Sequence, residues 1–159
     1  NRLEAGLVYD PIRQEMFTAS RGGIAQLNDR RMRVSGINSL ENALLGTGFP
    51  FRHPRHRPAY LGMFGALFDK CAEIRRAGAA SLDLAYVATG RLDAYWEIGL
   101  KAWDIAGGAL LVQEAGGLVS DFGGGNDFMK TGNIVAGNPK VFKALLQEMQ
   151  PHLTPELAR

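Results

Sequence analysis

The chain has 159 residues, of which 46% are apolar and 21% are charged, and its formal net charge is +2 at pH 7. This length allows one domain with a hydrophobic core, and the composition excludes a disordered or fibrous protein. The longest apolar stretches are well short of the roughly 20 residues that a membrane-spanning helix needs, so we expect no membrane partner. Cys71 is the single cysteine and has no partner for an internal disulfide, which favours a reducing compartment and a cytoplasmic location.

The first 35 residues have the pattern of antiparallel β-structure. Apolar, β-prone residues occupy 3–9 and 16–20, and Asp10-Pro11 between them favours a turn because proline fixes its own φ. The basic segment 30–34 is predicted to be a further strand at a sheet edge. We therefore expect a β-hairpin followed by an edge strand.

From residue 39 onward, predicted strands and helices alternate, which favours an α/β fold with a mixed sheet covered by helices. The predicted strands are 43–49, 74–77, 91–98, 118–122 and 134–136. The predicted helices are 60–72, 79–89, 101–115 and 141–149, and Ser39 has the residue type of a further helix N-cap. The buried face of helix 60–72 is predicted to consist of Leu61, Phe64, Leu67, Phe68 and Cys71. We divide the chain into an antiparallel β-segment, 1–38, and an α/β domain, 39–159.

Asp104 lies in the first turn of the predicted helix 101–115. The positive end of the helix dipole keeps a carboxylate ionised there, and an ionised carboxylate is a good ligand for a hard cation. The small residues 106–108 leave room for a ligand to approach. Helix capping is the alternative role of Asp104, and its position alone favours capping.

The segment from Arg75 to Ser81 connects a predicted strand to a helix through Gly78, Ala79 and Ala80. Free N–H groups at such a helix start can bind an anion or the hydroxyls of a polar ligand, and small side chains leave space for it. The alternative is an ordinary strand-to-helix turn that needs glycine for its geometry.

Glu97 is near the end of the predicted strand 91–98, on the opposite face from its neighbours Trp96 and Ile98. It could accept hydrogen bonds from sugar-like hydroxyls, or it could be a solvent-exposed residue without a role. Because Glu97 and Asp104 belong to consecutive elements, both carboxylates could converge on one ligand.

Arginines gather at 30–33, 52–57 and 75–76. Such clusters are either solvated surface or attract a phosphate-bearing substrate or a nucleic acid. Other chemistries are not supported: the histidines lack zinc spacing, the glycine pairs lack the lysine of a P-loop, and no nucleophilic serine or cysteine arrangement is present.

The segment Trp103–Gly108, followed by Gln113–Gly117, resembles the C-terminal signature of the inositol monophosphatase family. The resemblance covers essentially the whole chain, and it includes 22–28, 45–50, 75–81, 93–97 and 134–138. The Phe49-Pro50 segment and the arginines near it look most like the bacterial branch known as extragenic suppressor proteins.

The resemblance implies the C-terminal part of a layered αβαβα sugar-phosphatase fold, a homodimer, and Mg²⁺-dependent hydrolysis of myo-inositol monophosphate to inositol and phosphate. By position, Asp104 matches a metal ligand that also approaches the substrate. Gly78, Ala79 and Ala80 match the inositol-binding turn, and Glu97 matches an acceptor for an inositol hydroxyl. Ala79 stands where animal relatives have threonine, so its backbone is the remaining contact. The resemblance assigns no catalytic base or nucleophile in this chain.

The other metal ligands of the family come from a Gly-Glu-Glu segment and an Asp-Pro-hydrophobic-Asp-Gly-Thr segment, and neither occurs here. Asp10-Pro11-Ile12-Arg13 does not match because Arg13 stands at the second aspartate. We therefore expect that 1–38 is the remnant of the N-terminal antiparallel sheet of a metal-binding domain, and that the isolated chain is inactive. The alternative function is a regulatory protein that binds the transcription antitermination machinery or RNA, with which the bacterial branch is associated.

Overall fold

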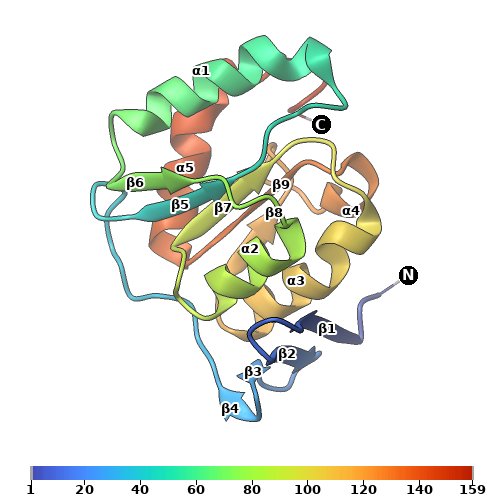
Figure 1. Ribbon diagram of the computed structural model, residues 1–159. Coiled ribbons are helices and arrows are strands. Elements are labelled where there is room, and N and C mark those ends of the chain that lie inside the picture. The colour runs from blue at the N-terminus through green and yellow to red at the C-terminus, as the bar shows by residue number, and fades with distance from the viewer. Residues whose placement is uncertain (1, 159) are drawn as a thin grey trace.

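The computed structural model describes residues 2–158, which form four successive layers (Figure 1). Helices α1 (Arg57–Phe68) and α5 (Pro139–Met149) cover one face of a five-stranded sheet. Helices α2 (Ala80–Ala88) and α3 (Ala102–Glu114) lie between its other face and a four-stranded sheet. The predicted α/β class, with a mixed sheet, covering helices and an antiparallel sheet, is confirmed.

The five-stranded sheet has the order β6-β5-β7-β9-β8. Its strands are β5 (Leu44–Thr47), β6 (Glu73–Arg75), β7 (Ala94–Glu97), β8 (Leu118–Ser120) and β9 (Ile134–Gly137). Strands β6, β5 and β7 are parallel, whereas β9 is antiparallel to both β7 and β8. The carboxyl ends of the three parallel strands therefore meet at one edge of the sheet, which is where open α/β sheets bind ligands.

The four-stranded sheet is an antiparallel meander in chain order. Its strands are β1 (Ala5–Asp10), β2 (Glu15–Ser20), β3 (Gln26–Leu27) and β4 (Arg30–Arg31). Alternation along β1 and β2 buries Val8 and Phe17 against α2 and α3, and it leaves Leu7, Tyr9 and Met16 exposed on the outer face. The smaller elements are η1 (Pro54–His56), α4 (Phe128–Thr131) and η2 (Gln150–His152).

Asp93, the residue before β7, connects four parts of the chain through its carboxylate and backbone. The carboxylate accepts hydrogen bonds from the hydroxyl of Ser35 (2.5 Å) and from the backbone N–H of Leu44 (2.6 Å). The backbone carbonyl of Asp93 accepts the N–H of Asn138, whose side chain donates to Ser35 and also caps α5. This buried network joins the connection between the two sheets to the amino ends of β5 and β7.

Several local predictions were wrong. Residues 39–42 form bends and a turn, not a capped helix, because Ala43 already bonds back to Leu40 and β5 begins at Leu44. Leu61 and Phe68 are 58% and 64% exposed. Helix α1 begins three residues earlier than predicted, and its buried residues are Ala59, Tyr60, Met63 and Leu67. Of the predicted face, Leu67 is therefore confirmed, and Phe64 and Cys71 are half-buried against the core.

Other elements differ in extent. The expected strand 30–34 is limited to Arg30–Arg31, and β3 and α4 were not predicted. Cys71 is half-buried. None of the helices in residues 2–158 combines the length and hydropathy that spanning a bilayer requires.

Strand β1 and helix α3 approach each other through two glycines. A Cβ atom at position 6 would lie 2.9 Å from the carbonyl oxygen of Gly107, and a Cβ atom at position 107 would lie 3.1 Å from the carbonyl oxygen of Leu7. Backbone atoms cannot move aside as a side chain can, so this contact fixes the distance between the four-stranded sheet and the helix layer.

We predict that Gly6→Ala lowers the free energy of unfolding by about 1–3 kcal/mol, since the new methyl group overpacks a backbone contact. Urea denaturation measures this change. Gly36→Ala is the matched control because a Cβ atom there meets nothing within 4 Å. Equal stability of the two variants would show that the sheet and helix tolerate a wider separation.

Candidate functional site

A cavity of about 420 Å³ lies at the carboxyl ends of β5, β6 and β7. All five residues predicted to bind substrate line it: Gly78, Ala79, Ala80, Glu97 and Asp104. Glu97 is the last residue of β7, Asp104 is in the first turn of α3, and residues 78–80 connect β6 to α2. The structure thus brings together three segments that the sequence singled out separately.

Glu97 is held in the cavity by its neighbours on two parallel strands. The register pairs Thr47 with Trp96, so Gly48 stands beside Glu97, and any side chain at Gly48 would overlap the Glu97 carboxyl group. The hydroxyl of buried Tyr95 donates a hydrogen bond to Oε2 of Glu97. Glu97 is half-buried, so its carboxylate is fixed but faces the cavity.

The charge of Glu97 responds to opposing influences. Burial raises the pKa of the Glu97 carboxyl above its ordinary value, and the nearby charge of Asp104 raises it further. The hydrogen bond from Tyr95 and the positive charge of Arg76 act to lower this pKa. These contacts therefore set the protonation state of Glu97, and with it the number of hydrogen bonds that its carboxyl group can accept.

We predict that Gly48→Ala lowers the free energy of unfolding by about 1–3 kcal/mol by forcing the Glu97 carboxyl group away from Tyr95. Glu97→Ala removes the carboxyl group that the new methyl group overlaps. Adding Gly48→Ala to Glu97→Ala should therefore cost much less unfolding free energy than adding it to wild type. Chemical denaturation of the four proteins gives the coupling. Strictly additive effects would contradict the contact.

Asp104 uses one carboxylate oxygen to stabilise its helix. Its Oδ2 accepts the backbone N–H of Lys101 at 2.9 Å, so the capping role is real. Within residues 2–158, Oδ1 has no hydrogen-bond partner, and the side chain is half-buried at the cavity wall. Capping and ligand binding therefore use different oxygens and do not exclude each other.

Asp104 also has the donor chemistry that suits Mg²⁺, which binds carboxylate oxygens. In the described part of the chain, no three His, Cys, Asp or Glu side chains are grouped to hold a metal ion. Asp104 therefore fits as one ligand, and Mg²⁺ commonly completes its shell with water and substrate phosphate oxygens beside one or two carboxylates.

The turn at residues 78–80 opens the amino end of α2 toward the cavity. Gly78 has a φ of +97°, and Ala79 occupies the N-cap position with an extended backbone and no side-chain capping bond. The first N–H groups of α2 are therefore not satisfied by a cap side chain, and such groups bind anions or hydroxyl oxygens.

The cavity wall includes residues that sequence reasoning did not assign. The guanidinium carbon of Arg76 lies 5.2 Å from the ring centroid of Phe49 and 5.4 Å from that of Phe51. This cation–π arrangement holds a positive charge at the cavity. The sequence indicated the arginines at 75–76 and the segment that includes Phe49. It did not show that these two segments face each other.

Asp83, on α2, is a buried carboxyl group that the sequence did not indicate. It is 3% exposed, and its Oδ2 has no hydrogen-bond partner among the described residues. Burial, assisted by the charge of Glu97, raises the pKa of Asp83 from 3.8 to about 7.

This shift predicts a pH-dependent stability. Between pH 3.8 and about pH 7 the folded protein binds the Asp83 proton while the unfolded chain releases it, so stability falls as pH rises through this range. Relative to Asp83→Asn, wild type should lose up to about 3 kcal/mol of unfolding free energy between pH 4.5 and pH 8. Urea denaturation across pH measures the difference, and parallel curves would show that Asp83 titrates normally.

Known proteins resemble this chain along its whole length. The sequence profile described as "Inositol monophosphatase family" matches residues 1–154. The protein named Nus factor SuhB is 66% identical in Pseudomonas aeruginosa and 54% identical in Escherichia coli K12. Each alignment covers 99% of this chain and 59% of the relative, so the chain spans less than two thirds of these relatives.

Solved structures share the fold. The extragenic suppressor protein suhB from Bartonella henselae superimposes with a TM-score of 0.90 at 45% identity, over 94% of this chain and 57% of that one. The inositol monophosphatase from Anabaena sp. PCC 7120 gives a TM-score of 0.88 at 36% identity, over 98% of this chain and 61% of that one.

Proposed function

The chain belongs to the inositol monophosphatase family, and on that premise we propose that it forms the substrate-binding part of a Mg²⁺-dependent phosphatase. In the full-length protein, the reaction is hydrolysis of myo-inositol monophosphate to inositol and phosphate. One observation supports this most strongly: Gly78, Ala79, Ala80, Glu97 and Asp104 line a single cavity at the ends of three parallel strands.

Each proposed role follows from what the side chain offers. The carboxylate of Glu97 accepts hydrogen bonds from inositol hydroxyls, and Tyr95 and Gly48 fix its position. The uncapped amino end of α2 donates N–H groups to the ligand. Arg76 adds positive charge for the phosphate-bearing substrate.

Asp104 is proposed to hold Mg²⁺ through its free oxygen and to approach the substrate at the same time. When bound, Mg²⁺ would supply Lewis-acid chemistry, a more acidic water molecule and charge stabilisation at the leaving oxygen, with Asp104 as one residue that would hold it. Because no three His, Cys, Asp or Glu side chains are grouped to hold a metal ion among the described residues, and Asp104 is the one metal ligand assigned at the cavity, we propose that the isolated chain does not turn over substrate.

The cellular location, the oligomeric state and the domain division are also proposals. We propose a cytoplasmic protein, consistent with a single cysteine that has no disulfide partner within the described residues. We propose a homodimer, for which exposed aromatic side chains such as Trp103 and Phe68 provide suitable surface. The division at residues 38 and 39 into parts of two domains remains a proposal, supported by the two separate sheets.

We predict that Asp104→Asn in the full-length protein lowers kcat by at least roughly 100-fold, the scale of a lost electrostatic contact at a reacting group. Asparagine keeps an oxygen that can accept the Lys101 N–H, so the fold should persist. Phosphate release at saturating Mg²⁺ is the measurement, and Asp69→Asn on the exposed surface is the control. Near-normal turnover of Asp104→Asn would reject the ligand assignment.

Glu97→Gln separates substrate recognition from chemistry. A hydrogen bond to a charged group contributes about 1.5–3 kcal/mol, so kcat/KM for inositol monophosphate should fall about 10–100-fold. An aryl phosphate lacks the ring hydroxyls, so Glu97→Gln should change kcat/KM for it only slightly. The control Glu41→Gln, at an exposed position, should change kcat/KM for neither substrate. Equal losses for both substrates would contradict the proposed contact.

A second candidate function is binding of the transcription antitermination machinery or RNA. The supporting observation is that relatives at 54–66% identity carry the name Nus factor. This function does not compete with hydrolysis, because one protein can carry both.

A further inference from the structure

The segment after β5 forms one wall of the cavity and then leads into η1. Residues 49–53 all line the cavity. The ring of His53 occupies the space beside Gly99, where any side chain at position 99 would overlap it. Gly99 belongs to the connection between Glu97 and Asp104. His53 therefore packs on the backbone that links the two carboxylates of the cavity.

A smaller hollow, of about 170 Å³, lies on the other side of this wall. His53, Ile98 and Gly99 line both the hollow and the cavity, so these three residues separate the two. The backbone at Gly99 is fixed from the hollow side, because Oδ1 of Asn133 accepts the Gly99 N–H at 3.1 Å. His53 is fixed differently: its carbonyl accepts the N–H of His56 at 3.0 Å, which places it at the start of η1. The position of the His53 ring therefore depends on η1.

The segment that follows α5 holds η1 from outside the cavity. Its last described residues lie beside the connection between β5 and α1 (Figure 1). Nη2 of Arg55 lies 2.5 Å from Oε1 of Glu156, and Nε of Arg55 donates to Nε2 of His56 at 3.3 Å. The same Glu156 oxygen is 3.9 Å from Nε2 of His56. Glu156 therefore lies against both Arg55 and His56 of η1.

Two buried residues anchor this contact. His56 is 6% exposed, and burial lowers the pKa of its imidazole, although the charge of Glu156 acts in the opposite direction. A neutral imidazole keeps the lone pair that accepts the Arg55 N–H. Leu157 is fully buried in a core cluster that also contains Tyr60 of α1. The residue next to Glu156 therefore cannot leave this place without exposing apolar surface to water.

We propose that Glu156 is a positioning residue for the substrate cavity: it holds η1 and, through η1, the ring of His53 against Gly99. The inference rests on the proposed function, which makes this cavity the substrate site. Glu156 itself lines the smaller hollow and not the cavity. A residue that touches no substrate therefore controls the affinity for it, because it fixes the wall that the substrate meets.

Hydrogen exchange of the full-length protein tests the contact without requiring turnover. The backbone N–H groups of His53 and His56 are hydrogen-bonded within residues 49–56, so their exchange reports the opening of this segment. Loss of an exposed ion pair in Glu156→Gln should speed this exchange by about 2–5-fold. Arg55→Gln should do the same, and the double variant should exchange no faster than either single variant, since all three lose one ion pair. Unchanged exchange in both single variants would overturn the proposal.

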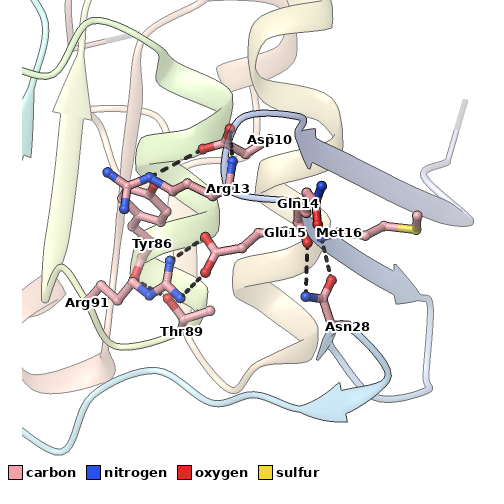
Figure 2. Close-up of polar contacts among 9 residues, drawn as sticks. All are labelled: Asp10, Arg13, Gln14, Glu15, Met16, Asn28, Tyr86, Thr89 and Arg91. Atoms are coloured by element: carbon pink, nitrogen blue, oxygen red, sulfur yellow. Dashed lines mark hydrogen bonds and ion pairs between the residues drawn. The ribbon is translucent and has the colours of Figure 1, made fainter.

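Two control variants separate this contact from general destabilisation. Glu148→Gln removes an exposed ion pair of 2.7 Å with Lys70, which lies beyond the other end of α1. Glu15→Gln breaks a stronger pair, since Arg91 donates two hydrogen bonds of 2.7 and 2.6 Å to Glu15 of β2 (Figure 2). Both controls should keep the wild-type exchange of residues 49–56. An equal acceleration in either control would show that the effect is not specific to Glu156 and would overturn the proposal.

Hydrolysis of inositol monophosphate by the full-length protein tests the effect on the cavity. In Glu156→Gln, KM should rise about 2–5-fold with kcat unchanged, because the contacts that hold Glu97 and Asp104 remain. His53→Ala should raise KM at least as much, and Glu156→Gln should add nothing to it.

Two results would overturn the positioning role of Glu156. One is an additive rise in KM when Glu156→Gln is combined with His53→Ala, since Glu156 would then not act through His53. The other is a lower kcat with unchanged KM, which indicates loss of folded protein. Absence of hydrolysis by the wild-type protein would contradict the proposed function instead, and the exchange result would still decide whether Glu156 holds η1.

Discussion

The carboxylate of Asp93 ties the amino ends of β5 and β7 to the segment that leaves the four-stranded sheet. It accepts hydrogen bonds from Leu44 and Ser35, and Asn138 extends the network to the start of α5. A buried carboxylate is stable only when such donors surround it. By fixing where β5 and β7 begin, this network sets the register between the two strands. The register then determines which residues meet at their carboxyl ends.

The cavity is the consequence of that register. With Thr47 opposite Trp96, the glycine after β5 stands beside the glutamate that ends β7, and the glutamate carboxyl group occupies the space that a side chain at Gly48 would fill. The same edge receives the turn after β6 and the first turn of α3. The residues singled out from the sequence therefore meet in one cavity, although they come from separate elements.

The sequence predicted much of this arrangement, because alternation, helical periodicity and chain-breaking residues are local signals. They identified most of the strands, four of the five helices and the α/β class, and the residues at 78–80, 97 and 104 were selected individually. The contact of Gly48 with Glu97 and the burial of Asp83 were missed because both depend on pairing between distant segments. The spacing also misplaced part of the buried face of α1, where Tyr60 is at the core and Leu61 and Phe68 are exposed.

We propose that the cavity at β5, β6 and β7 binds the inositol ring. A crystal structure of the full-length protein with myo-inositol monophosphate and Mg²⁺ tests it most directly. We expect ring hydroxyls within hydrogen-bond distance of the Glu97 carboxylate and of the backbone at residues 78–80, with Asp104 bound to the ion. An inositol ring bound outside this cavity, or a Glu97 carboxylate that contacts no ligand atom, would contradict it.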